Sequence, residues 1–315
     1  MMKVDPSFLK GLIVPVFTPF QLNDTLSLNL EIIPEYAKFL AKQKITGVLI
    51  GGTVAEGQAL SLNERKALTE EWVKASKLEK LHLMVQVGGA PLPDVLELAK
   101  HAESLKVDSL LTLPEVYFRP TNGKELATYL RLVSNAAPKT PLFYYYTPRR
   151  APVNVNIVEF MENYGNEIPT LVGLKYTFTD LAEANQLLEI KCKKIIVTFV
   201  NEELTYLACA LGAESFMLPM SSLLTKLCLS IPEAWKFKDL EKAQNNQQLL
   251  TKAFHIFKKY GHGPHGVKLA MNHLTPFNFG DSRIPWNRFS SEDELKMMKE
   301  LKAEVLDKLE SLNLK

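Results

Sequence analysis

Eight short apolar segments alternate with longer amphipathic segments up to residue 218 of this 315-residue chain. Each apolar segment spans four to seven residues, as buried strands do, and no hairpin signal joins two of them. Alternation of this kind favours a parallel sheet, and eight units favour closure into a (β/α)8 barrel, the TIM barrel. We expect the strands at 11–17, 47–50, 81–87, 108–113, 141–145, 171–175, 195–199 and 215–218.

Helical patterns fill the intervals between these strands and most of the C-terminal part. Four further helices follow the last strand, and a connector containing Pro and Gly interrupts them at 276–286. The pattern predicts a barrel over residues 1–221 and a helical extension over 222–315 that packs on it. The helices are expected at 28–41, 60–78, 92–105, 123–137, 156–164, 181–190, 202–211, 222–235, 240–259, 264–273 and 291–312.

The composition is that of an ordinary globular protein, with 46% hydrophobic and 23% charged residues. A net charge of +2 gives no reason to expect nucleic acid or a membrane surface as partner. No apolar run approaches the roughly 20 residues that span a bilayer, and the N-terminus shows no secretory pattern. Cys192, Cys209 and Cys228 are widely spaced, which favours reduced thiols in a cytoplasmic protein, and the six histidines form no metal-binding pattern.

The stretch 171–177, Leu-Val-Gly-Leu-Lys-Tyr-Thr, is a predicted strand that ends on Lys175. Burial of a lysine without a partner lowers its pKa, and the resulting free amine can attack a carbonyl to form a Schiff base. The alternative interpretation is a strand-end lysine whose ammonium reaches water. The stretch alone leaves both open.

In a (β/α)8 barrel the active site lies at the carboxyl ends of the strands, and this rule selects candidates before any chemistry is considered. Lys175 is the only lysine that we expect at such a strand end, and tyrosines 144–146 lie on the neighbouring strand. A covalent amine catalyst is therefore favoured. A small molecule with a carbonyl group is its expected partner.

Three motifs at these strand ends carry a family resemblance. Gly52-Thr-x-x-Glu-Gly57 follows the second strand, Tyr145-x-x-Pro148 ends the fifth, and Gly173-Leu-Lys-Tyr-Thr177 ends the sixth. Together they resemble the dihydrodipicolinate synthase/N-acetylneuraminate lyase family of class I pyruvate aldolases, from residue 11 to about 285. The segments 141–146 and 70–73 are most similar to the N-acetylneuraminate lyase branch.

The resemblance implies a Schiff-base aldolase that needs no cofactor and takes a 2-keto acid. Lys175 would form the covalent bond, Tyr145 would orient the substrate and move protons, and Thr53 would bind the substrate carboxylate. The branch cleaves N-acetylneuraminate, or sialic acid, to N-acetylmannosamine and pyruvate. Homotetramers are expected from the same resemblance.

Four further residues correspond to positions that contact substrate in the family. Thr177, Asn201 and Glu202 match contacts to the sugar hydroxyls, although Glu202 also fits an ordinary carboxylate at a helix start. Tyr117 matches a tyrosine that some members supply across a subunit interface.

The chain departs from the family pattern at four places. Val54 replaces a loop hydroxyl, and the loss of one hydrogen bond to a charged group costs about 1.5–3 kcal/mol. Phe199 stands where Gly is usual, and we expect its ring to fill space that the sugar needs. Arg150 is either a surface charge or a mark of an acidic aldehyde substrate, and the segment 218–222 (Leu-Pro-Met-Ser-Ser) leaves a serine contact open.

These departures keep two alternatives open. One is a related pyruvate-dependent aldolase or synthase with a different aldehyde partner, which Val54 and Phe199 favour. The other is a catalytically weakened barrel that binds a keto acid or a sugar, which the altered loop favours and the presence of Lys175 and Tyr145 opposes.

Overall fold

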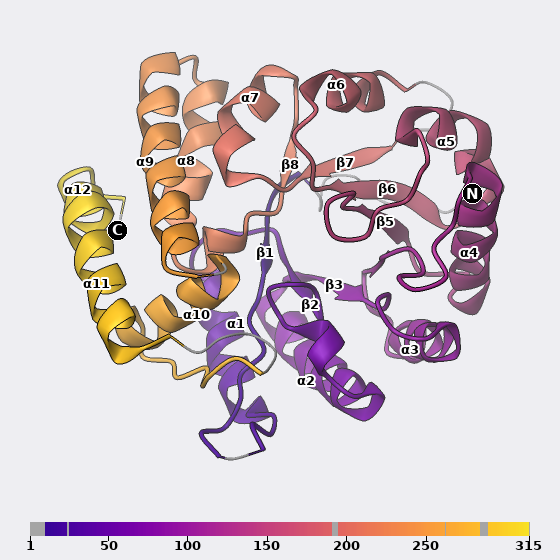
Figure 1. Ribbon diagram of the computed structural model, residues 1–315, viewed down its shortest axis with the longest axis horizontal. Helices are drawn as coiled ribbons and strands as arrows, with labels where there is room; N and C mark the ends of the chain where they lie inside the picture. The colour runs from indigo at the N-terminus through magenta and orange to yellow at the C-terminus, as the bar shows by residue number, and fades with distance from the viewer. Residues whose placement is uncertain (1–9, 24, 191–194, 262, 284–288, 315) are drawn as a thin grey trace.

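The computed structural model describes residues 10–23, 25–190, 195–261, 263–283 and 289–314. Its eight strands are parallel, pair in sequence order and close into a barrel, which confirms the predicted fold (Figure 1). The last strand pairs with the first through Gly11–Ser215 and Leu12–Phe216. The strands are β1 (Gly11–Pro15), β2 (Gly47–Ile50), β3 (His82–Gln86), β4 (Ser109–Thr112), β5 (Leu142–Tyr146), β6 (Leu171–Tyr176), β7 (Ile196–Phe199) and β8 (Ser215–Phe216).

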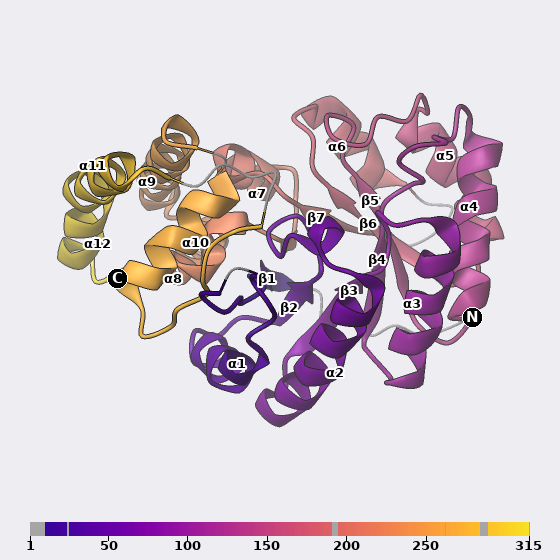
Figure 2. The ribbon, with the colours of Figure 1, turned by 60° about the horizontal axis from the view of Figure 1, so that its bottom comes forward.

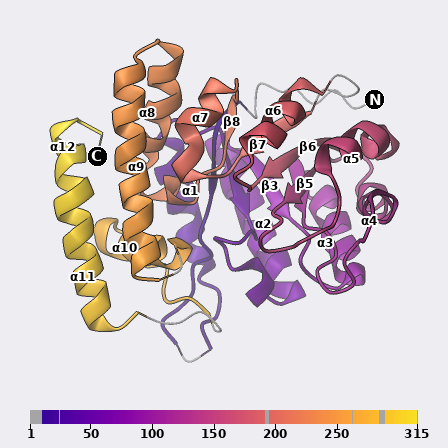
Figure 3. The same cartoon turned by 45° about the horizontal axis from the view of Figure 1, so that its top comes forward.

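Helices surround the barrel, and the later ones gather on one side of it (Figures 1 and 2). α8 contacts α7 and β1 as well as α9, and α10 lies at one end of α9 (Figure 3). The boundary at residues 221 and 222 stays a prediction. The helices are α1 (Ile33–Ala41), α2 (Leu62–Glu79), α3 (Leu92–Ser104), α4 (Gly123–Ala136), α5 (Ile157–Tyr164), α6 (Leu181–Glu189), α7 (Thr205–Ala210), α8 (Thr225–Lys236), α9 (Leu240–Lys259), α10 (Gly263–Leu274), α11 (Ser291–Leu301) and α12 (Asp307–Ser311).

The first helix begins later than the apolar pattern predicts. The expected start was residue 28, but α1 begins at Ile33 after a short 3₁₀ turn at Leu30–Ile32. Pro34 explains the difference, because proline has no N–H and is compatible only with the first turn of a helix. Among the described helices, none is long and apolar enough to cross a membrane. Cys192 lies outside the described residues, while Cys209 and Cys228 are buried free thiols.

Side chains along each strand alternate between two apolar cores. One core lies between the barrel and its helices, and the other fills the barrel interior. In β5, for example, Tyr144 and Tyr146 face the helices, whereas Phe143 and Tyr145 face the barrel axis. Burial on both faces is the reason that the strands of a parallel sheet are nearly continuous apolar runs.

A register shift in β6 sets which of its residues face the axis. Leu142 pairs with Leu171, but the next residue, Phe143, pairs with Gly173, so Val172 is an extra residue. A Cβ atom on Gly173 would lie 2.3 Å from the Ile196 carbonyl oxygen and 2.6 Å from the Phe143 ring. Glycine is therefore required at this close approach of backbone and ring. After the shift, Tyr145 pairs with Lys175.

We expect Gly173→Ala to destabilise the fold. The added methyl group has no room, and overpacking of this kind costs about 1–3 kcal/mol. Thermal denaturation should show a melting temperature several degrees below that of the wild type. Gly165→Ala is the matched control, because its new methyl group would meet only the Met161 side chain at 3.8 Å. Equal melting temperatures for the two variants would contradict the role assigned to Gly173.

Candidate active site

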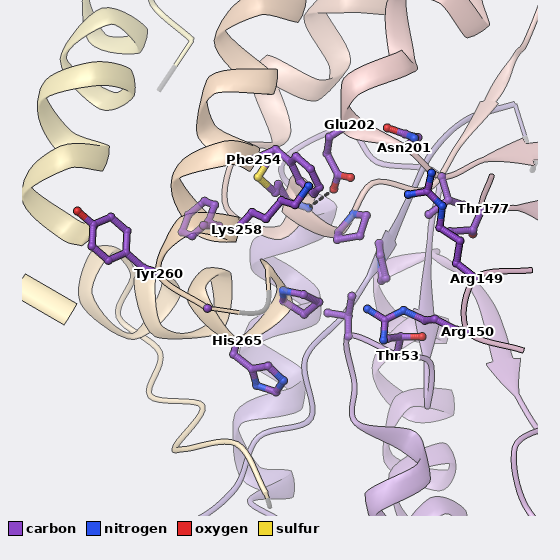
Figure 4. A pocket seen from close by; sticks show the side chains of 18 of the residues that line it. Thr53, Arg149, Arg150, Thr177, Asn201, Glu202, Phe254, Lys258, Tyr260 and His265 are labelled. Atoms are coloured by element: carbon purple, nitrogen blue, oxygen red, sulfur yellow. Dashed lines mark hydrogen bonds between the residues drawn. The ribbon is translucent and has the colours of Figure 1, made fainter. Parts of the chain in front are cut away.

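A cavity of about 780 Å³ opens where the carboxyl ends of the strands face the C-terminal helices. Figure 4 shows Thr53, Arg149, Arg150 and Thr177 on its barrel side, opposite side chains of the C-terminal helices. Of the ten residues singled out from the sequence, the cavity lining contains Thr53, Val54, Tyr145, Arg150, Lys175, Thr177, Asn201 and Glu202. Tyr117 and Phe199 are not among the lining residues.

Lys175 and Tyr145 form the centre of the site. They are register partners on adjacent strands, and both side chains are buried. The Lys175 Nζ lies 4.0 Å from the centroid of the Tyr145 ring. The alternative interpretation of Lys175 as a lysine that reaches water does not fit a residue that is 4% exposed.

The surroundings change the acidity of both groups. Burial lowers the pKa of Lys175, and the nearby Tyr145 and Glu202 only partly counteract this effect. Burial alone would raise the pKa of Tyr145, but the charge of Lys175 and the polar side chains of Thr53 and Thr177 next to the phenol outweigh it, so the pKa is lowered. Both groups therefore lose their protons more easily than usual. This suits the amine to nucleophilic attack and the phenol to proton transfer.

The loop between β2 and α2 brings Thr53 to this pair. The Thr53 hydroxyl lies 3.4 Å from the Tyr145 hydroxyl, and Val54 lines the same cavity. The loop is a tight turn in which the Gly57 N–H donates to the Gly52 carbonyl at 3.1 Å. A Cβ atom on Gly57 would lie 1.8 Å from the Gly51 oxygen, so only glycine is compatible with this turn.

Thr177 and Asn201, two of the residues matched to sugar contacts, both line the cavity but differ in their hydrogen bonding. The Thr177 hydroxyl is buried without a hydrogen-bond partner in the described part of the chain, although it lies close enough to the Tyr145 phenol to lower its pKa. The Asn201 side-chain oxygen accepts from the Glu203 N–H at 2.9 Å, at the start of a short 3₁₀ helix. Thr177 is thus free to bind a ligand, whereas the Asn201 oxygen has a structural partner.

Glu202 is buried and does not behave as an exposed carboxylate at a helix start. One of its oxygens accepts from the Met220 N–H at 3.1 Å, and its backbone carbonyl accepts from Gln247 at 2.6 Å. Burial raises the pKa of Glu202 to about 7, although the backbone N–H groups of Glu202 and Met220 and the Lys175 charge lower it. The carboxyl group therefore exchanges a proton in the neutral range.

Arg150 lines the cavity, and its charge contributes to the lowered pKa of Lys175. Its guanidinium forms no ion pair with any described residue, and neighbouring Arg149 donates only to the Thr179 hydroxyl at 3.3 Å. Two arginines without carboxylate partners favour an anionic ligand at this edge of the cavity.

The expectation that Phe199 fills the sugar space is wrong. Its ring belongs to the core between the barrel and the helices and packs against Tyr176, with ring centroids 5.8 Å apart. Strand alternation is the reason, since the next residue, Val200, faces the barrel interior and lines the cavity.

Tyr117 lies outside the cavity of its own chain. It is 82% exposed and forms an edge-to-face pair with the exposed Phe118, centroids 4.9 Å apart. Its assignment as a residue supplied to another subunit stays a prediction. In the loop after β8, Pro219 and Met220 line the cavity, while the Ser221 and Ser222 hydroxyls bind backbone carbonyls of Leu218 and Pro15.

The sequence interpretation missed the contribution of the C-terminal helices. Phe254, Phe257, Tyr260, Pro264 and His265 complete the cavity wall. The interpretation also missed a buried ion pair in which Lys268 of α10 donates to Glu56 of the β2–α2 loop at 3.0 Å.

A signal for this ion pair was present in the sequence, because Lys268 interrupts the apolar face that α10 forms with Val267 and Met271. The described residues contain no cluster of three or more His, Cys, Asp or Glu side chains that could hold a metal ion.

The closed barrel and the buried lysine–tyrosine pair at its mouth define a lyase of the class I aldolase type. The chain belongs to the dihydrodipicolinate synthetase family, whose profile matches residues 8–304.

Three relatives illustrate where the chain falls within this family. N-acetylneuraminate lyase A of Xenopus laevis is 31% identical over 292 residues, covering 91% of this chain and 95% of the relative. The mouse (Mus musculus) N-acetylneuraminate lyase is 28% identical over 309 residues, with coverages of 98% and 95%. The solved N-acetylneuraminate lyase, or sialic acid aldolase, of Aliivibrio salmonicida superposes with a TM-score of 0.88 at 31% identity, covering 94% of this chain and 96% of that one.

We expect Glu202→Gln to change how stability depends on pH. A carboxyl group whose pKa rises from 4.5 to about 7 on folding keeps its proton in the folded state, so stability is lost as the pH rises through this interval. The full loss is on the order of 3 kcal/mol. The variant should therefore gain in free energy of unfolding relative to the wild type between about pH 5 and pH 8.

Urea denaturation of the wild type and of Glu202→Gln at about pH 5 and pH 8 measures this gain in free energy of unfolding. The amide oxygen of glutamine can still accept from the Met220 N–H, so the comparison isolates the charge. A difference between the proteins that does not change with pH would contradict the raised pKa.

Proposed function

We propose that this protein is an N-acetylneuraminate lyase, which cleaves sialic acid to N-acetylmannosamine and pyruvate through a Schiff base on Lys175. The observation that carries the proposal is the buried Lys175 amine, 4.0 Å from the Tyr145 ring centroid, in a cavity of about 780 Å³. The similarity of nearly the whole chain to N-acetylneuraminate lyases supports the substrate.

In this proposal the keto acid binds with its carboxylate at the β2–α2 loop. Thr53 supplies a hydroxyl, and backbone N–H groups of the turn supply further donors. The keto carbon then lies near Lys175, whose neutral amine attacks it. The carbonyl oxygen leaves as water after protonation, and the C=N bond of the iminium replaces the C=O bond.

Carbon–carbon cleavage follows from the electron demand of the iminium. The hydroxyl proton on the carbon that becomes the aldehyde is removed, the bond between that carbon and the carbon next to the imine breaks, and its electron pair forms the enamine. Tyr145 is the group that relays these protons, since its pKa is lowered and it contacts both Thr53 and Lys175. Protonation of the enamine carbon and addition of water release pyruvate and restore the amine.

Thr177 and Glu202 are proposed to bind the sugar part of the substrate. The Thr177 hydroxyl, which has no hydrogen-bond partner among the described residues, offers a donor and an acceptor. The Glu202 carboxyl group can act as either, because its pKa is about 7. No cofactor takes part in this scheme. We further propose a homotetramer in which Tyr117 serves a neighbouring subunit, a cytoplasmic location, and an extension that begins at residue 222.

A second candidate is a related pyruvate-dependent aldolase or synthase whose aldehyde partner is acidic. The Arg150 guanidinium at the cavity edge, which forms no ion pair with the described residues, favours it. A third, a weakened barrel that only binds a keto acid or a sugar, is favoured by Val54, which offers no hydroxyl where the carboxylate would bind.

Pyruvate and borohydride test the covalent step directly. The wild type should gain the mass of a reduced pyruvate adduct, and Lys175→Ala should not. Lys258→Ala is the matched control, because Lys258 lines the same cavity from α9. A wild type that forms no adduct would contradict both the N-acetylneuraminate lyase and the related aldolase or synthase. An assay with N-acetylneuraminate and a set of other 2-keto acids, acidic ones included, then distinguishes the two.

The loop hydroxyl missing at Val54 is expected to limit turnover. Val54→Thr keeps the shape of the side chain and adds one donor, which is worth roughly ten- to a hundredfold in rate or affinity toward a charged group. Steady-state kinetics should show a higher kcat/KM. Thr53→Val, the reverse change next to it, should lower kcat/KM by a similar factor. An unchanged kcat/KM in Val54→Thr would refute the assignment of the carboxylate to this loop.

A further inference from the structure

The loop that carries Thr53 is anchored from a distant part of the chain. Glu56 follows Thr53 by three residues and adopts a left-handed backbone conformation, with φ 56° and ψ 33°. This conformation is uncommon for a residue other than glycine and persists only where the surroundings hold it. The Glu56 side chain is 1% exposed and points away from solvent.

Both carboxylate oxygens of Glu56 are bound by the C-terminal region. Lys268 of α10 donates to one oxygen at 3.0 Å, and the backbone N–H of Arg283 donates to the other at 2.7 Å. The Lys268 side chain is itself only 3% exposed. Lys268 also donates to the Asp281 carbonyl at 3.1 Å and lies 4.4 Å from the centroid of the Phe20 ring. The direction of the Glu56 side chain is thus fixed at two points.

Arg283 extends the anchor to the start of α2. Its guanidinium forms a bidentate ion pair with Glu64 and donates to the Ala59 carbonyl at 2.9 Å and the Leu26 carbonyl at 2.7 Å. Figure 2 shows the segment after α10 running beside the chain between β1 and α1, where Phe20 and Phe279 are hydrogen-bonded. The C-terminal region therefore binds the β2–α2 loop at Glu56, in its middle, and at its junction with α2.

Hydrogen bonds within the loop connect Glu56 to the residues proposed to bind substrate. The Glu56 N–H donates to the Thr53 carbonyl at 3.2 Å, and the Thr18 hydroxyl donates to the Ala55 carbonyl at 2.6 Å. Because Thr53 in turn contacts Tyr145, a shift of Glu56 changes the placement of Thr53 relative to the Lys175–Tyr145 pair.

We propose that the buried Lys268–Glu56 ion pair positions the β2–α2 loop for the keto-acid carboxylate, so that the C-terminal extension sets the affinity of the barrel for its substrate. A buried ion pair is a poor way to gain stability, because apolar side chains of similar volume do as well or better. Its directional hydrogen bonds do hold one backbone conformation, which apolar contacts do not. Lys268 and Glu56 are positioning residues and need not touch substrate.

Lys268→Met and Glu56→Gln test the proposal with two measurements. The first is the pyruvate concentration that gives half-maximal borohydride trapping, and it rests on the proposed function. The second is hydrogen exchange of the loop peptide over residues 50–59, which needs no activity. We expect the half-saturating concentration to rise about ten- to a hundredfold with a smaller change in the rate at saturation, and loop exchange to accelerate. Peptides of β5 and β6 should keep wild-type exchange.

Lys252→Met is the matched control. It removes the cation of an exposed ion pair with Glu304 in the same extension and should change neither measurement. The double variant Glu56→Gln/Lys268→Met leaves no unpaired buried charge, so it should recover thermal stability while its half-saturating pyruvate concentration stays high. Both measurements can also be made on the double variant if a single variant fails to fold.

Two results would overturn the inference. One is a folded Lys268→Met with wild-type half-saturation and loop exchange. The other is faster exchange throughout the barrel with unchanged half-saturation, which would make the pair a general structural contact. If the wild type forms no adduct, the proposed function fails, and loop exchange in the variants decides the positioning role by itself.

Discussion

Closure of the parallel sheet between β8 and β1 is the constraint on which the rest of the structure depends. Closure brings the carboxyl ends of all eight strands to one mouth, so loops that are more than a hundred residues apart in sequence face one cavity. It also forces strict alternation, since each strand has one face toward the axis and one toward the helices. Lys175 meets Tyr145 because both occupy axis-facing positions in register.

The sequence was sufficient for the fold and for the centre of the site. Eight apolar runs separated by helical patterns specify the strand order, and the strand-end rule then selects Lys175, Tyr145 and Thr53 without side-chain coordinates. The fold and the position of these residues at the cavity are predictable because they depend on local periodicity and on one general property of barrels. The same information places Glu202 at the mouth, although the burial that raises its pKa comes from packing that no local pattern specifies.

Other features depend on information that the sequence pattern does not carry. The direction of the Phe199 side chain depends on the alternation of side chains along β7. An error of one residue at the end of a short strand reverses the face on which a side chain is expected. The wall formed by Phe254, Tyr260 and His265 depends on how α9 and α10 pack against the barrel, which no local signal specifies. The Lys268–Glu56 pair joins residues 212 positions apart.

Two lysines are buried in the described part of the chain, and they differ in their partners. Burial lowers the pKa of both Lys175 and Lys268. Lys268 faces a carboxylate at 3.0 Å, which favours the ammonium and counteracts part of the effect of burial. Lys175 faces a phenol, with Glu202 acting only at longer range, so no carboxylate beside it holds its proton.

The difference between these partners separates the two functions. A cation that keeps its charge can hold a loop, and an amine that releases its proton can attack a carbonyl, but one lysine cannot do both in the same state. In our proposals the barrel supplies the reactive amine, and the C-terminal extension supplies the cation that holds the loop. If both roles hold, substrate affinity and chemical reactivity can change independently, through residues that lie on different parts of the chain.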